Sequence, residues 1–159
     1  MEKSTIRIRR LLVFFMVMLV LSGITAIPAE QELELLCRFF QPGSRVGAFL
    51  DKVYISLHQT NLQYPWLAYG YDWLAFAHIQ LAIVFVGPLR DPVRNKWVVQ
   101  FGMIACVLVL PFALVAGHLR GLPLWWLAID CSFGLLGILP LLFAWKEINK
   151  LENFQTNNI

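Results

Sequence analysis

Residues 122–145 read LPLWWLAIDCSFGLLGILPLLFAW, and this stretch decides how the rest of the chain is interpreted. It is long and apolar enough to cross a bilayer, which needs about 20 apolar residues of helix. Asp130 nevertheless lies about a third of the way along it. A carboxylate at that depth is energetically costly unless other groups of the protein compensate its charge. We therefore expect the other apolar segments to form a bundle around Asp130.

The composition of the whole chain agrees with a membrane protein. Of its 159 residues 58% are hydrophobic and only 14% are charged, and the mean hydropathy is +0.64. Soluble domains average about 25% charged residues. The net charge of +3 is small and the basic residues form no continuous stripe, so we expect no nucleic-acid partner.

The apolar segments predict an all-α fold, an integral membrane four-helix bundle. We place the spans at about 8–27, 72–88, 97–117 and 122–145, within a single membrane domain of residues 1–152. Residues 153–159 are predicted to form a flexible tail. The short connectors between the last three spans make these helices antiparallel.

Residues 28–71 form the one long loop, and we expect two short amphipathic helices within it. Apolar residues recur there at helical spacing on either side of the turn sequence Gln41-Pro42-Gly43-Ser44. They are Leu33, Leu36, Cys37 and Phe40 before the turn, and Val46, Phe49, Leu50, Val53 and Leu57 after it. Their apolar faces fit either the membrane surface or the outer end of the bundle, and we favour the second placement.

The distribution of Lys and Arg predicts the orientation. Nine of the thirteen lie in the N-terminal segment, the 90–96 connector and the C-terminal segment. Because basic residues concentrate on the cytoplasmic side, we expect both termini in the cytoplasm, the 28–71 loop outside it, and a plasma-membrane location.

The first span has two interpretations. Its basic start, its apolar run and the small residues Ala26 and Ala29 resemble a cleavable signal peptide. The run is nearly as long as a full span, and Ile24 or Ile27 would occupy the −3 position of a cut after either alanine. We favour a retained first span.

Small residues at helical spacing indicate where the spans pack, because lipid gives helices no hydrophobic reason to associate. The third span carries such a stripe, and the fourth places Asp130 on one face with Gly134 and Gly137. In the second span His78 shares a face with two alanines. The stripe of the third span consists of Gly102, Cys106, Val109, Ala113 and then Ala116 or Gly117, and the alanines of the second span are Ala75 and Ala82.

The candidate site is an intramembrane polar cluster of Asp130, His78 and Arg120. At 1.5 Å per residue, His78 and Asp130 lie at similar depths, about 9–10 Å inside the predicted outer boundary. We therefore expect Asp130 to be neutralised by His78, or by Arg120 from the adjacent turn. A functional interpretation is an acid–base pair that binds a proton, cation or polar head group. The alternatives are a polar tie that fixes helix register and a protonated Asp130 that donates to a backbone carbonyl.

No cofactor, metal or catalytic residue is predicted. Three cysteines without ligand spacing indicate neither a disulfide framework nor a zinc site. His118 and His78 differ in depth by about 9 Å, which disfavours a bis-histidine haem. Known nucleotide-binding and hydrolase motifs are absent from the sequence.

The function predicted first is therefore a non-enzymatic accessory or structural bundle. It would contact membrane lipids and either a membrane-protein partner or further copies of itself. The first alternative is a small transporter or ligand-binding protein that uses His78 and Asp130, and the second is a lipid-active membrane enzyme.

Overall fold

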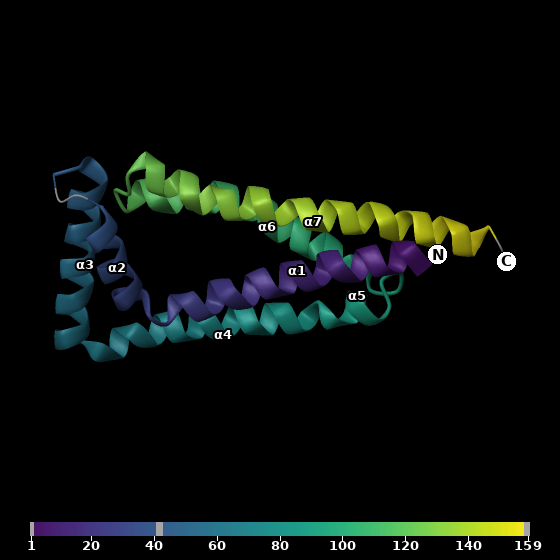
Figure 1. Cartoon of the computed structure of the whole chain (residues 1–159), viewed down its shortest axis with the longest axis horizontal. Coiled ribbons are helices and arrows are strands. Elements are labelled where there is room, and N and C mark those ends of the chain that lie inside the picture. The colour runs from purple at the N-terminus through teal and green to yellow at the C-terminus, as the bar shows by residue number, and fades with distance from the viewer. Residues whose placement is uncertain (1, 41–42, 158–159) are drawn as a thin grey trace. The chain divides into compact units, whose positions relative to one another are not determined.

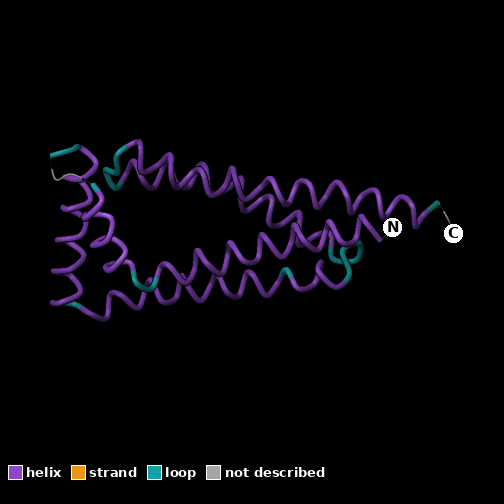
Figure 2. Tube along the Cα trace, viewed as in Figure 1, coloured by secondary structure: helices purple, strands orange, loops and turns teal. Residues whose placement is uncertain are grey.

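Every regular element of the part of the chain that the structure describes is a helix. The computed structural model describes residues 2–40 and 43–157. Figure 2 shows how little of the trace is loop, with turns confined to the connections between helices. The elements in chain order are α1 (Glu2–Ala26), α2 (Ala29–Phe39), α3 (Arg45–Gln63), the 3₁₀ helix η1 (Pro65–Ala68), α4 (Tyr69–Val84), α5 (Val86–Arg90), α6 (Lys96–Leu119) and α7 (Leu124–Thr156).

Four helical segments are long and apolar enough to cross a membrane. They are Ser4–Ala26, Pro65–Arg90, Lys96–Leu119 and Leu124–Thr156. Their number confirms the four apolar spans expected from the sequence. α7 has 33 residues and is therefore about 50 Å long, more than the roughly 30 Å of a hydrocarbon core. One end of α7 thus extends beyond the length that lipid can cover.

The second apolar segment differs from the predicted span 72–88 at both of its ends. α4 begins at Tyr69, three residues before the predicted start of the span, so Asp72 lies within its first turn. The same helix ends at Val84 and resumes as α5. Pro88 explains this break, because it lacks the N–H that would bond the carbonyl of Val84 in a continuous helix.

The C-terminal end of α7 lies beyond the apolar run of the fourth span. Helix continues through Thr156, into the residues 153–159 for which a flexible tail was predicted. Asn158 and Ile159 lie outside the described residues, as do Gln41 and Pro42 of the predicted turn.

The chain divides into two compact units, and α1 and α4 contribute to both. One unit consists of Met1–Val17 and Ala82–Ile159, and the other of Met18–Leu81. The centre of the first unit lies between the start of α1, the break at Phe85 and the α6–α7 pair. Its fully buried side chains include Ile8, Leu12, Phe85, Val99, Leu141 and Ile148.

In the second unit, α2 and α3 run across the direction of α1 and α4 (Figure 1). Leu33 of α2 and Leu50 of α3 are the apolar residues buried in this helical hairpin. Ser44 caps α3 by accepting a 2.9 Å hydrogen bond from the amide of Gly47. A side-chain cap thus defines the start of α3. The two helices of the hairpin pack through a small apolar seam.

Candidate functional site

Glycines bring α6 and α7 into contact, as the small-residue stripes predicted. A Cβ on Gly134 would lie 2.5 Å from the carbonyl oxygen of Cys106, and one on Gly137 would lie 3.3 Å from the Cys106 Sγ. Nearer the α6–α7 turn, Gly117 makes room for the side chain of Leu127. The predicted packing faces of the third and fourth spans are confirmed by these approaches.

Asp130 lies on α7 one turn before Gly134, at the edge of the α6–α7 contact, and is half-buried. Arg120 is the exposed residue that ends α6. Among the described residues, the ion pairs do not include one between these two side chains. The predicted neutralisation of Asp130 by Arg120 is therefore not seen as an ion pair among the described residues, and the polar cluster stays a prediction.

His78 lies on α4 and faces α1. Its Nδ1 is 2.8 Å from the carbonyl oxygen of Leu74, so the ring donates a hydrogen bond within its own helix. A Cβ on Gly23 would lie 2.8 Å from the His78 Cβ and 2.8 Å from the Ala75 carbonyl oxygen. His78 belongs to the Met18–Leu81 unit and Asp130 to the other, and their pairing stays a prediction.

Sequence reasoning missed a polar cluster centred on Glu147 of α7. Ser4 donates a 2.7 Å hydrogen bond to Oε2, and Lys150 Nζ lies 2.9 Å from Oε1. Arg7 of α1 approaches the same Oε1 at 3.4 Å. The Glu147 side chain is only 12% exposed, so these contacts replace much of its water. The sequence did contain an indication of this cluster. Glu147 lies between two lysines in the C-terminal segment, which was expected on the same side of the membrane as the basic N-terminal segment.

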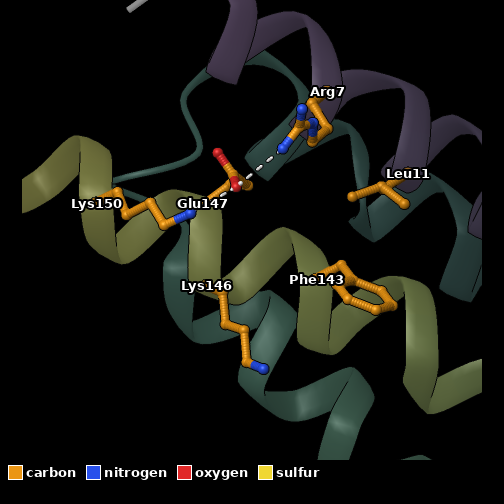
Figure 3. Close-up of a pocket in the computed structure, with 6 residues that line it drawn as sticks. All are labelled: Arg7, Leu11, Phe143, Lys146, Glu147 and Lys150. Atoms are coloured by element: carbon orange, nitrogen blue, oxygen red, sulfur yellow. Dashed lines mark hydrogen bonds and ion pairs between the residues drawn. The ribbon is translucent and has the colours of Figure 1, made fainter.

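The Glu147 cluster forms one wall of an open groove of about 390 Å³ (Figure 3). Figure 3 shows α1 contributing one basic and one apolar side chain, and α7 the remainder. The lining residues are Arg7, Leu11, Phe143, Lys146, Glu147 and Lys150. The groove therefore combines positive charge with an apolar surface.

A second polar cluster ties α2 to α3. Glu30 lies 2.5 Å from His58 Nδ1 and accepts a 2.6 Å hydrogen bond from Asn61 Nδ2, while Tyr54 stacks on the His58 ring. The hydrogen bonds from His58 and then Asn61 hold the pKa of the Glu30 carboxyl below its usual range. These contacts fix the register of the helical hairpin.

Within residues 2–40 and 43–157, no three His, Cys, Asp or Glu side chains gather closely enough to hold a metal ion. Cys37, Cys106 and Cys131 are all free thiols. Cys37 is the one outside the apolar helices, and burial followed by a hydrogen bond with Asp51 raises the pKa of its thiol. A raised pKa makes it a weaker nucleophile at neutral pH.

The described part of the chain is thus all-helical, and four of its helical segments are long and apolar enough to cross a membrane. Comparison with protein families, curated proteins and solved structures gives no match.

Proposed function

We propose that the chain is a non-enzymatic accessory or structural bundle of four transmembrane helices in the plasma membrane, with both termini in the cytoplasm. The first support is the surface of its apolar helices. Large apolar side chains point outward along α6 and α7, among them Ile104, Leu108, Phe112, Phe133 and Leu136. Such faces suit lipid or neighbouring helices, whereas a water-exposed surface would not tolerate them.

The observation that carries the accessory role is a set of exposed apolar side chains outside the α6–α7 pair, at the two ends of the α2–α3 hairpin. Phe39 at the end of α2 is 76% exposed, and Leu62 and Trp66 at the end of α3 and in η1 are also exposed. Leu67 and Tyr69 beside Trp66 are exposed as well, and contiguous apolar side chains of this size mark interaction surfaces. We infer that the segment from α2 to η1 contacts a membrane-protein partner or a second copy of the chain.

Co-purification in a mild detergent tests this function. We expect the chain to elute with a stoichiometric protein partner or as a homo-oligomer, and Phe39→Asp with Leu62→Asp to abolish that association. A matched control is Glu34→Gln with Arg38→Gln, which changes the same helical hairpin at an exposed ion pair. A wild-type protein that purifies as a monomer without any partner would contradict the accessory role.

A second candidate function rests on Asp130. A half-buried carboxylate in an apolar helix, without an ion pair to Arg120, is a binding group for a proton, cation or polar head group. In this function His78 would supply the partner base. If Asp130→Asn leaves folding, abundance and every phenotype of a gene deletion unchanged, this candidate is eliminated.

A further inference from the structure

The groove beside Glu147 has more positive charge than its own acid neutralises. Arg7, Lys146 and Lys150 line the groove together with one carboxylate, which leaves a formal excess of two positive charges. Arg7 is 68% exposed and its contact with Glu147 is a long 3.4 Å, while Lys150 is 71% exposed. Lys146 makes no ion pair among the described residues, and its Nζ lies 6.0 Å from the Phe143 ring. Donors therefore remain available for an anionic ligand.

The other part of the groove is apolar. Leu11 of α1 and Phe143 of α7 line it, and Figure 3 shows both on the same side of Arg7, Glu147 and Lys150. On α7 the change is abrupt, because the apolar run ends at Trp145 and Lys146 follows. This sequence of apolar and basic residues is that of a membrane interface, where acyl chains give way to phosphates.

We propose that this groove binds the head group of an anionic phospholipid. The phosphate would accept hydrogen bonds from Arg7, Lys146 and Lys150, and the first part of an acyl chain would lie along Leu11 and Phe143. A volume of about 390 Å³ holds a phosphate and glycerol but no complete lipid, so the chains stay in the bilayer. The proposal goes beyond the accessory function and rests only on the membrane placement of α1 and α7.

Native mass spectrometry of the delipidated protein in detergent tests the site directly. The protein is titrated with dioleoylphosphatidylglycerol and, separately, with dioleoylphosphatidylcholine, whose acyl chains are the same. We expect the first bound lipid to be at least fivefold tighter for the anionic lipid. Lys146→Gln with Lys150→Gln should weaken that binding by roughly fivefold for each lysine removed.

Two further variants keep the test decisive. Arg90→Gln with Arg94→Gln removes the same charge from the connector outside the groove and should leave the first binding event unchanged. Lys146→Gln alone keeps every hydrogen bond of Glu147, so it reports on the site even if the double variant fails to fold.

Several results would overturn the proposal. Equal affinity for the two lipids, or equal weakening by the groove and connector variants, would mean general electrostatic attraction. Displacement of the lipid by inorganic phosphate would point to a soluble anion as the ligand. A phosphate concentration of about 10 mM is enough to occupy a weak anion site with a dissociation constant in the millimolar range. Tight binding of an acidic peptide without lipid selectivity would point to a protein partner. None of these outcomes affects the co-purification that tests the accessory function.

Discussion

At Gly134 the backbone of α7 lies directly against the backbone of α6. A Cβ there would lie 2.5 Å from the Cys106 carbonyl oxygen and 3.4 Å from the Val109 Cβ. A carbonyl oxygen inside a helix cannot rotate away as a side chain can. Any residue larger than glycine must therefore push the two helices apart.

Gly134→Ala should accordingly lower the free energy of unfolding by about 1–3 kcal/mol, the usual cost of overpacking. Far-ultraviolet circular dichroism during titration of the micellar protein with dodecyl sulfate measures this change. The control is Gly70→Ala in α4, where nothing lies within 4 Å of the added Cβ. There alanine should cause no loss and gain up to about 1 kcal/mol of helix propensity. Equal losses at both positions would contradict close packing at Gly134.

Glu30 gives the α2–α3 hairpin a pH dependence with a defined sign. Its folded pKa is depressed, so the carboxylate stabilises the hairpin fully above the ordinary glutamate pKa of about 4.3. As pH falls further, through the depressed folded pKa, this stabilisation is lost. Amide protection factors in α2 and α3, which are corrected for the intrinsic exchange rate at each pH, should therefore fall on acidification.

Glu30→Gln should remove this part of the acid sensitivity and make the hairpin less protected at neutral pH. Glu34→Gln is the matched variant, because Glu34 pairs with Arg38 on an exposed surface of the same helix. An acid response that is the same in Glu30→Gln as in the unaltered chain would assign the pH dependence to other groups.

The residue-scale predictions from sequence succeeded where spacing alone carries the information. Gly134 and Gly137 were recognisable because small residues four or three positions apart share a helix face. Gly23, which makes room for Ala75 and His78, was not recognised, because its importance depends on a partner helix. Glu147 was missed for the same reason, since Ser4 lies 143 residues away in the chain.

At the scale of elements, Glu147 joins the start of α1 to α7. The bond from Ser4 is short and partly buried, and the Glu147 side chain has little exposure to water. Nearby, Ile8 and Leu12 on α1 are fully buried. Polar and apolar contacts thus hold this part of α1 within the unit that contains α6 and α7.

A double-mutant cycle of Ser4→Ala and Glu147→Gln should show a coupling free energy of about 1–2 kcal/mol, as expected for a hydrogen bond to a charged acceptor. The measurement is again unfolding by dodecyl sulfate. A cycle with Ser56→Ala in place of Ser4→Ala is the control, because Ser56 donates its hydrogen bond to the Lys52 carbonyl within its own helix. Additive losses in the Ser4 cycle would show that this bond contributes nothing to stability.

The sequence predicted the number of apolar helices well because each is a long, nearly uninterrupted apolar run. It was less accurate at the ends. The break at Phe85 arises from Pro88 a few residues later, and the start of α4 follows η1 without a polar cap. The continuation of α7 through Thr156 lies in a polar segment, where hydropathy gives no signal. Lys96 contacts Glu152 there at 2.6 Å, a long-range support that periodicity does not encode.

At the scale of the whole molecule, we propose a four-span topology with both termini in the cytoplasm. Its support is the distribution of basic residues along the chain together with four helices of sufficient length. An even number of spans puts the N- and C-terminal ends on the same side. The same topology puts α2 and α3 on the opposite side from the connector that contains Arg94.

Labelling of single cysteines by a membrane-impermeant maleimide in intact cells tests this topology most directly. In a chain whose native cysteines are replaced by alanine, Gly43→Cys, Arg94→Cys and Asn157→Cys place thiols at exposed positions. We expect Gly43→Cys to be labelled in intact cells, and Arg94→Cys and Asn157→Cys to be labelled only after permeabilisation. Labelling of Asn157→Cys or Arg94→Cys in intact cells, or protection of Gly43→Cys until permeabilisation, would contradict this topology.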